Sequence, residues 1–541
     1  MSKSLKDMSV VAFSTLLSRL LGLVRDAQGA AFFGISILNS AFYTAFRTPN
    51  LFRRFLAEGS LTAAFIPMLH EELKEHGREG AFQLLSKVSS WLLVITAGLV
   101  GIGMIGFGFA RVLFLNHNDK WYLEADLTTF LFPYLIFICL AASFSATLQA
   151  MGRFTEQSLS PIFLNLSMII FLGIFGRFFS QTGLGQMYWL CAGVLFGGFL
   201  QAAIPGAVLV REGWRPKLDL TLSPRVREIA VLMIPGLFGS AIYQINIYFS
   251  GLLAFSLNDS AASVLFLANR VMEVPIGIFA IAVATVSFHS ITKHANNRDY
   301  TAMGAAYLKG QRLILTINIP AAVGLVLLSE PIVRLLFQRG AFHASDTAEM
   351  VPILAAFAIG MPFFSAVSQM TRTFYAMKDM RTPVKAALAS FVANIGLSFV
   401  LMHFFSTVGL ALASNIAIIV QAVWLQSALG LKLPNLHFST LVPTLLKIAL
   451  ASLGMGVAVF FGWDLVRALF GDRHMGDLIP FVGVVRFLAH IRISDLLAIF
   501  GLIPLAVAVY GSLLWALKVE GREDLEAIIA KRFRRKAESV K

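Results

Sequence analysis

Arginines and acidic side chains recur inside the apolar runs of this sequence, where charge is costly. The first run contains Ser18, Arg19, Arg25 and Asp26. On a helical wheel these side chains fall within an arc of about 140°, so they form one polar stripe. Such a stripe cannot face hydrocarbon and must line a bundle interior or a water-filled cavity.

The second apolar run repeats this pattern with more positive charge. Its polar and bend-forming residues are Ser40, Tyr43, Arg47, Pro49, Asn50, Arg53, Arg54, Glu58 and Gly59. Most of them share one helix face, and a kink at the proline would bring Arg53 toward it. Later runs carry a second group, made of Asn269, Arg270, Glu273 and Arg372.

The arginines outnumber the acids that could pair with them. One interpretation is that ion pairs lock the bundle, such as Arg25 with Glu58 or Arg270 with Glu273. A central arginine costs roughly 2.5–3.5 kcal/mol to insert, however, so a purely structural role is an expensive use of several. Surplus guanidinium predicts a bound anion. Because Arg binds phosphate through two parallel hydrogen bonds, a phosphate or pyrophosphate fits best.

The elements that must position these side chains are membrane helices. Of 541 residues, 57% are hydrophobic and 14% are charged, against about 25% charged in soluble chains. Mean hydropathy is +0.75. We expect an all-α polytopic membrane protein of about fourteen spans. They lie at about 8–32, 37–57, 85–112, 127–150, 158–180, 185–209, 228–256, 261–291, 307–337, 349–376, 384–404, 407–429, 441–465 and 495–517.

The net charge of +14 follows from the loops and does not indicate nucleic-acid binding. Lys and Arg concentrate in alternate loops, for example at 211–227 and 378–385. This asymmetry places both termini in the cytoplasm of a multi-pass inner-membrane protein. The basic tail at 521–541 is expected to lie on anionic lipid.

Weak internal repeats indicate two related halves. "AFR" at 45–47 resembles "ANR" at 268–270, and "QAMGRF" at 149–154 resembles "YAMKDM" at 375–380. The offset of six spans preserves orientation, as in transporters built from two lobes. We divide the chain into an N-terminal lobe at 1–220, a C-terminal lobe at 221–434, two further helices at 435–520 and the basic tail at 521–541.

Enzyme chemistry finds little support. No His, Cys, Asp or Glu group has metal-ligand spacing, and no P-loop or nucleotide-binding glycine pattern occurs. The charged stretch "HEELKEHGRE" at 70–79 is interpreted as an amphipathic linker. Cys139 and Cys191 lie in apolar runs and are read as packing residues. We therefore expect a transporter without a metal or other cofactor.

Four stretches resemble the MurJ (MviN) family of lipid II flippases, in the multidrug/oligosaccharidyl-lipid/polysaccharide exporter superfamily. They are "LSRLLGLVRDA" at 17–27, "AFRTPNLFRRFLAEGSLTAAFIPML" at 45–69, "ANRVMEVPIG" at 268–277 and "FYAMKDMRTPVK" at 374–385. The resemblance implies two six-helix lobes and a lipid-tail groove beside the last two helices. It also implies alternating access that moves lipid II, an undecaprenyl-pyrophosphate-linked disaccharide-pentapeptide, to the periplasmic leaflet for peptidoglycan synthesis and cell shape.

The resemblance also implies roles for individual residues. Pyrophosphate and headgroup binding is implied for Arg19, Arg25, Arg53, Arg270, Ser18 and Asn50. Gating or arginine orientation is implied for Asp26, Glu58, Glu273 and Gly59. Further candidates by position are Arg47, Arg54, Asn269 and Arg372. Membrane lipids and cell-wall synthases are the implied partners besides lipid II.

Some positions depart from the family pattern. Ser40 and Asn269 stand where some members have an acid, and Asn246 and Asn394 stand where some have a carboxylate for a cation. The coupling therefore stays open between a monovalent cation and the membrane potential. Two alternatives also stay open: a flippase for another polyprenyl-pyrophosphate-linked saccharide, and a non-transporting membrane scaffold.

Overall fold

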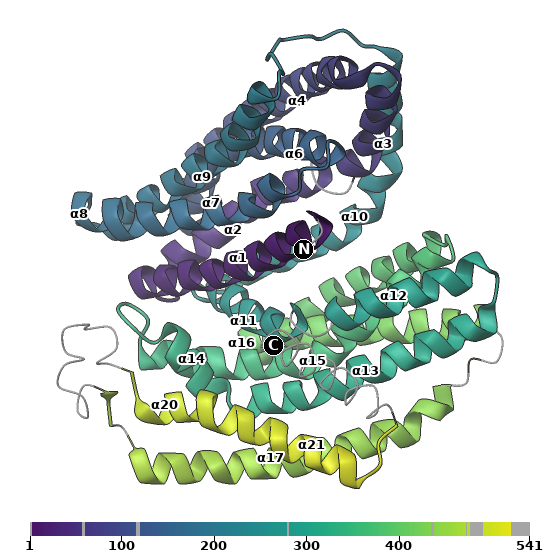
Figure 1. Cartoon of the computed structure of the whole chain (residues 1–541). Coiled ribbons are helices and arrows are strands. Elements are labelled where there is room, and N and C mark those ends of the chain that lie inside the picture. Colours follow the sequence, from purple (N-terminus) through teal and green to yellow (C-terminus); the bar gives the residue numbers. More distant parts are fainter. Residues whose placement is uncertain are drawn as a thin grey trace, which may run out of the picture. The chain divides into compact units, whose positions relative to one another are not determined.

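The chain folds almost entirely into helices (Figure 1). The computed structural model describes residues 3–56, 60–114, 119–277, 281–433, 436, 438–471, 473–475 and 491–520. Within these ranges the extended structure is limited to one isolated bridge between His474 and Arg492. Contacts divide the chain into two compact units. Unit 1 is Met1–Ser263 with Arg339–Phe342, and unit 2 is Val264–Gln338 with His343–Lys541.

Unit 1 is a bundle in which α7 packs against both α1 and α9, and α2 packs against α5 and α10. Its helices are α1 (Lys3–Phe33), α2 (Ile37–Leu56), α3 (Ser60–Glu75), α4 (Gly77–Phe114), α5 (Asp119–Leu131), α6 (Tyr134–Ala150), α7 (Thr155–Ile170), α8 (Arg177–Phe179), α9 (Gly183–Arg211) and α10 (Pro224–Leu257). A π-helical turn, Phe171–Gly176, joins α7 to α8.

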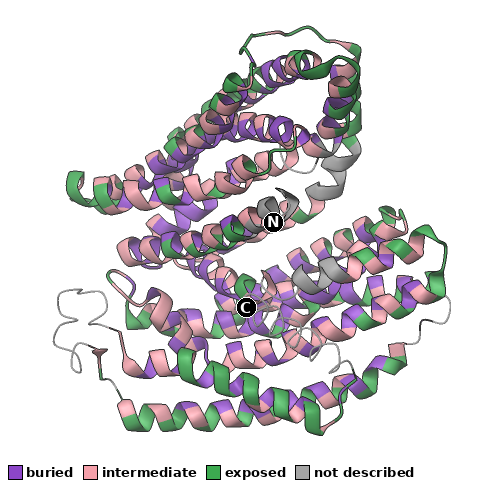
Figure 2. Cartoon of the chain, in the orientation of Figure 1, coloured by how far each residue is buried: buried purple, intermediate pink, exposed green. Residues whose placement is uncertain are grey.

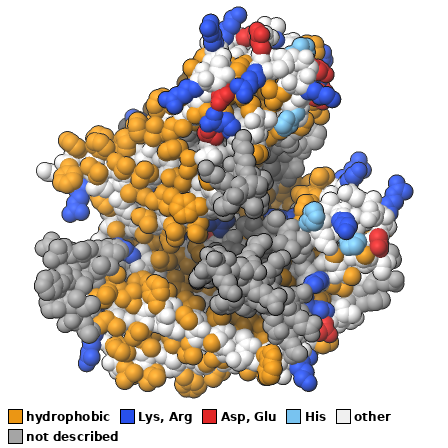
Figure 3. Space-filling model, viewed as in Figure 1, with side chains coloured by type: hydrophobic (Ala, Val, Ile, Leu, Met, Phe, Trp, Pro, Cys, Tyr) orange, Lys and Arg blue, Asp and Glu red, His pale blue; other side chains and the backbone are white. Residues whose placement is uncertain are grey.

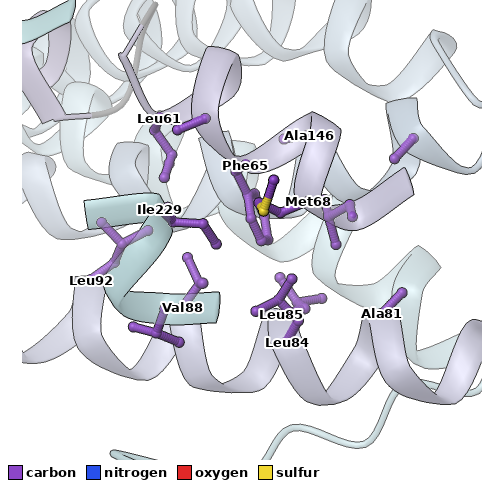
Figure 4. Close-up of a cluster of buried hydrophobic side chains, with 14 of the residues drawn as sticks. Leu61, Phe65, Met68, Ala81, Leu84, Leu85, Val88, Leu92, Ala146 and Ile229 are labelled. Atoms are coloured by element: carbon purple, nitrogen blue, oxygen red, sulfur yellow. The ribbon is translucent and has the colours of Figure 1, made fainter. Parts of the chain in front are cut away.

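The short helix α3 is part of this bundle, although it is too charged to count as a span. Leu61, Phe65 and Met68 recur at helical spacing and are buried. Figure 4 shows them against Leu85 of α4 and Ile229 of α10. The stretch at 70–79 differs from the linker that we expected, because it forms the end of α3 and the start of α4.

Unit 2 has α15 in its interior, packed on α13 and α16. Its helices are α11 (Ala261–Pro275, which begins at the border of unit 1), α12 (Ile281–Asn296), α13 (Tyr300–Leu327), α14 (Ser329–Phe337), α15 (Ala344–Ala376), α16 (Arg381–Lys432), α17 (Val442–Phe470), α20 (Ile493–Leu497) and α21 (Ile503–Ala516). Along α17 and α21 one face is buried in unit 2 and the other is exposed (Figure 2).

The 52 residues of α16 form two spans. A straight helix of this length would measure about 78 Å, whereas a hydrocarbon core is about 30 Å thick. The chain breaks at Ser406, whose φ is 49° and ψ is −132°. The two arms then run antiparallel, since Ser390 Oγ donates to the Ala417 carbonyl at 2.9 Å.

A buried ion-pair cluster holds α14, α17 and α20 together at one end of unit 2. Arg334 contacts Asp495 at 2.8 Å and Glu330 at 2.9 Å. The Arg334 guanidinium also lies over the ring of Trp463, 5.8 Å from its centroid. These contacts fix the two C-terminal spans to the helix bundle beside them.

The expected all-α polytopic fold is confirmed. Every expected apolar run coincides with a helix or with consecutive helices. Nine helices within the described ranges are long and apolar enough to cross a membrane, and hydrophobic side chains dominate the visible face of each unit (Figure 3). Contacts place α10 with unit 1, so the unit border follows Ser263 rather than residue 220. The tail at 521–541 lies outside the described residues.

The two "AM" repeats form the same turn. Each follows a long helix and has a residue at positive φ, Gly152 at 79° and Lys378 at 60°. The next amide then bonds back five residues: Arg153 N to Leu148 O at 2.8 Å, and Asp379 N to Phe374 O at 3.0 Å. A C-terminal cap with this backbone pattern occurs at both places, which gives the weak sequence repeat a structural counterpart.

Candidate functional site

Arg25 is the centre of a buried hydrogen-bond network in unit 1. Arg25 is 9% exposed and Asp26 is 2% exposed. Arg25 Nε and Nη2 donate to one oxygen, Asp26 Oδ1, at 2.9 and 2.6 Å. Arg25 Nη1 donates to Asn165 Oδ1 on α7 at 2.9 Å. The guanidinium therefore has acceptors on both sides, as a buried charge requires.

Asn165 joins the two helices that carry this centre. Its Nδ2 donates to the carbonyl of Ser18 at 3.1 Å, about two turns before Arg25 on α1. A Cβ added to Gly22 would make an ordinary contact of 3.7 Å with the same nitrogen, so α1 and the Asn165 amide lie close together here. Ser18 thus contributes its backbone oxygen to the site.

The arginines of α2 contact neutral groups of α10. Arg54 Nη1 donates to Gln244 Oε1 at 2.7 Å. The guanidinium of Arg47 lies against the backbone of Gly251, where an added Cβ would come within 1.9 Å of Nη1. No Asp or Glu occurs between residues 37 and 56. This helix therefore brings a local surplus of positive charge to unit 1.

Asn50 and Arg53 lie on the same helix after its proline. Asn50 Nδ2 donates to the Phe46 carbonyl at 2.7 Å, which uses the amide within α2 beside Pro49. Arg53 is half-buried and lies near Cys139 of α6. The side chain of Arg19 on α1 is exposed.

Ser40, at the other end of α2, bonds to residues near the start of α11, which also belong to unit 1. Its hydroxyl donates to the Asp259 carbonyl at 2.5 Å and contacts Ser263 Oγ at 3.1 Å. Glu58 and Gly59 lie outside the described residues, so the structure places neither of these predicted site residues.

Unit 2 carries the second predicted group on α11. Arg270 contacts Glu273 at 3.3 Å, and Asn269 Nδ2 contacts the other oxygen of the same carboxylate at 3.3 Å. The Arg270 guanidinium also lies over the ring of Phe266. These contacts are long and the side chains are more than one-third exposed, so the group is loosely held. Arg372, on α15, is half-buried.

The sequence-based set thus includes residues that contact one another and misses their neutral partners. Ser18, Arg25 and Asp26 belong to one network, and Arg54 and Arg47 both reach α10. Asn165 and Gln244 were not predicted, although each is a polar residue in an apolar run and could have been noted for that reason. Among the described residues, no group of three His, Cys, Asp or Glu could hold a metal ion.

The arrangement is suited to binding an anion. A carboxylate oxygen already occupies two donors of Arg25, and phosphate oxygens bind guanidinium with the same geometry. The α2 arginines bring further guanidinium donors, of which Arg54 contacts the neutral amide of Gln244. Nothing in this set resembles a nucleophile paired with a base.

Comparisons with known proteins agree with this chemistry. The family model described as lipid II flippase MurJ matches residues 29–472. A probable lipid II flippase MurJ of Vibrio cholerae serotype O1 is 33% identical over 448 residues, covering 79% of this chain and 83% of the relative. A probable lipid II flippase MurJ of Bdellovibrio bacteriovorus is 30% identical over 531 residues, covering 96% and 95%.

A solved structure described as lipid II flippase MurJ in an inward closed conformation has the same fold. It matches with a TM-score of 0.74 at 24% identity, covering 95% of this chain and 99% of that chain. The family model spans well over half of this sequence, and both relatives are matched over more than two thirds of their length. The chain belongs to the lipid II flippase MurJ family.

Proposed function

We propose that this protein carries lipid II from the cytoplasmic to the periplasmic leaflet of a bacterial inner membrane by alternating access. It acts as a transporter and changes no covalent bond. Membership of the lipid II flippase family supports this substrate. The observation that carries the proposal is the surplus of arginine on α2, which has Arg47, Arg53 and Arg54 and no acid.

The pyrophosphate of lipid II is the group that this surplus attracts. Pyrophosphate offers several anionic oxygens, and guanidinium binds such oxygens two at a time. Arg53 and Arg19 of unit 1 bind it or the adjacent sugar. Arg270 of unit 2 is a further candidate for binding an anionic oxygen. The loose contact of Arg270 with Glu273 supports this role, because little interaction energy is lost when Arg270 changes partner.

Without substrate, the Asp26 carboxylate accepts the Arg25 hydrogen bonds that a phosphate oxygen would otherwise accept. In the described conformation it occupies the Nε and Nη2 donors of Arg25. A pyrophosphate that reaches Arg25 competes for these donors, while Asn165 keeps the guanidinium in place through Nη1. The pair then returns when substrate leaves, so Arg25 is never left buried without an acceptor.

The polyprenyl tail runs along the exposed apolar face of the C-terminal helices. On α17 this face includes Leu446, Leu453 and Phe461, and on α21 it includes Val507. Both termini lie in the cytoplasm, because that orientation puts the basic loops inside. Cell-wall synthases that consume lipid II are the partners on the periplasmic side.

Complementation of a bacterium depleted of its own flippase tests the proposal. We expect the wild-type gene to restore growth and outside-facing lipid II, whereas Arg53→Gln and Arg270→Gln should restore neither at matched membrane levels. Arg78→Gln is the matched control, since Arg78 is an exposed arginine paired with Glu212. A well-expressed wild-type protein that leaves lipid II facing inward would refute the substrate assignment.

A further inference from the structure

A buried acid on α5 has no role in the site described so far. Glu124 is 5% exposed and lies in a membrane-spanning segment. In the described part of the chain its one hydrogen bond comes from Thr128 Oγ1, which donates to Glu124 Oε1 at 2.8 Å. No basic side chain among those residues forms an ion pair with it.

Glu124 lies on α5, which packs mainly against α2 and α4 and whose start also contacts the end of α10. At the contact with α10, Trp121 packs edge-on against Phe255 with ring centroids 5.0 Å apart. Lys120 Nζ donates to the Ser256 carbonyl at 3.1 Å beside them. Glu124 is the next residue on this face of α5, one turn beyond Trp121. Its environment is therefore a helix junction closed by aromatic rings.

The neighbouring hydroxyls are neutral. Tyr248 of α10 lies within electrostatic reach of Glu124. Tyr248 Oη also accepts a hydrogen bond of 3.3 Å from Thr48 of α2. Hydroxyl groups can solvate a carboxylic acid, but they do not neutralise a carboxylate. An ionised group here would carry a large desolvation cost without a compensating charge.

Asp126, two residues further along α5, shows how a paired acid differs. It contacts Arg111 of α4 at 2.5 Å and accepts a hydrogen bond from Tyr188 of α9. Residues two apart on a helix point in different directions, so the two acids lie in separate environments. Asp126 thus has a cationic partner, and Glu124 has none within the described part of the chain.

Several other titratable and charged groups lie near this part of α5. On the helices that pack against α5 they are Tyr43 and Arg47 of α2, Arg111 of α4 and Tyr188 of α9. Tyr248 of α10 is also near Glu124. Arg111 and Tyr188 bind Asp126, and the Arg47 guanidinium lies against Gly251. Lys120 binds a backbone carbonyl. None of these contacts supplies a countercharge to Glu124.

We propose that Glu124 is a proton-binding site and that its protonation is coupled to the transport cycle. The described conformation favours the neutral acid, because Glu124 is buried and forms no ion pair with a described residue. A conformation that admits water to the α5–α10 junction favours the carboxylate, and the proton leaves to that water. Proton concentration then shifts the balance between the two conformations.

A proton fits this site better than a metal cation. Calcium takes six to eight oxygen ligands and magnesium takes six, whereas the described contacts of Glu124 provide one carboxylate and one hydroxyl. The step itself is simple: the carboxylate takes a proton from hydronium, and water is released. Lipid II keeps all its bonds.

Infrared difference spectroscopy on the purified protein tests the proton site without any substrate. Wild-type protein at neutral pH should show the carbonyl band of a protonated carboxylic acid. Glu124→Gln should remove that band, Glu124→Asp should shift it, and the matched control Asp126→Asn should keep it. A band that survives unchanged in both Glu124 variants would overturn the assignment, even if one of them folds poorly.

The coupling rests on the proposed function and needs a transport assay. Vesicles of phosphatidylethanolamine and phosphatidylglycerol would carry the full-length protein and fluorescent lipid II, with a pH step imposed across the bilayer. We expect a several-fold change in flipping rate for wild type and Asp126→Asn, and none for Glu124→Gln. An equal response in Glu124→Gln would overturn the coupling. Failure of every variant to flip lipid II, with the infrared result intact, would instead refute the proposed function alone.

Discussion

Arg153 and Asp379 occupy the same position in the two repeated turns, and each pairs with the end of a later helix. Arg153 Nη1 contacts Glu212, which follows α9, at 2.6 Å. Asp379 contacts Lys432, the last residue of α16. The two halves thus use one architecture with the charges exchanged. Since each turn residue has the same charge sign as the other half's helix end, pairing within a half is favoured over pairing across halves.

The Asp379 pair predicts a defined pH dependence of stability. Burial raises the pKa of Asp379, but hydrogen bonds from Lys432 and Thr382 outweigh burial and lower this pKa to about 2. An unfolded aspartate has a pKa of about 3.9. The stabilisation is therefore complete above about pH 4 and is lost as the pH falls toward 2. Thermal unfolding in detergent should show a gap between wild type and Asp379→Asn that closes over this range.

Lys432→Met serves as the control for this gap. Lys432→Met removes the cation and keeps the carboxylate with its Thr382 contacts. In this background, the difference in melting temperature caused by Asp379→Asn should be smaller and should close at a higher pH. A gap between wild type and Asp379→Asn that is the same at pH 2 and pH 6 would contradict the ion pair as its source.

Asn165→Ala should destabilise the protein by about 1–3 kcal/mol, because Arg25 Nη1 loses its acceptor while remaining buried. Asn165→Asp retains the acceptor for Arg25 but loses the donor to the Ser18 carbonyl, so it should destabilise the protein less than Asn165→Ala does. It should slow lipid II transport by binding Arg25 more tightly than Asn165 does. Thermal unfolding and vesicle flipping separate the two effects. The control is Asn269→Ala, whose contact is long and partly exposed, with an expected cost within about 0.5 kcal/mol.

Gly251→Ala should displace the Arg47 guanidinium, because the new Cβ would lie 1.9 Å from Nη1. Overpacking of this kind costs about 1–3 kcal/mol. Gly98→Ala provides the comparison, since nothing lies within 4 Å of its added Cβ and alanine is the better helix former. Equal melting temperatures for the two variants would show that Arg47 moves aside without cost.

Asp495→Asn should cost about 1–3 kcal/mol, because Arg334 stays buried and loses one of its two carboxylate partners while keeping Glu330. Arg467→Gln should cost less, because Arg467 is half-exposed and its contact with Glu330 is long, at 4.0 Å. Replacing the pair together, with Arg334→Met and Asp495→Leu, should recover most of the loss. Urea unfolding of wild type, Arg334→Met, Asp495→Leu and the double variant gives the coupling energy. Strictly additive losses would rule out a direct interaction.

Hydropathy alone located the spans, because a membrane helix must be apolar over its whole length. The break at Ser406 divides α16 between the two spans expected there. The helix α3 was missed, since its charged end lowers its hydropathy and its buried face has only Leu61, Phe65 and Met68 to indicate a helix. An amphipathic helix inside a bundle does not meet a criterion built for lipid-facing ones.

The sequence predicted the contacts of the candidate site within one helix but not those between helices. The wheel placed Arg25 and Asp26 on one face of α1, and their hydrogen bonds agree with that. The partner on α7 depends on how two distant helices pack, which spacing within α1 does not determine. Asn165 therefore emerges from the structure, and so does the isolation of Glu124, which depends on what α10 brings beside it.

The pairing of Arg111 with Asp126 bears on how the chain enters the membrane during synthesis. The two residues lie near the ends of α4 and α5 that follow one another along the chain. A single helix emerging from the translocon would have to present either charge to lipid alone. Released together as a hairpin, the two helices present a neutral pair. We expect α4 to remain at the translocon until α5 has been synthesised.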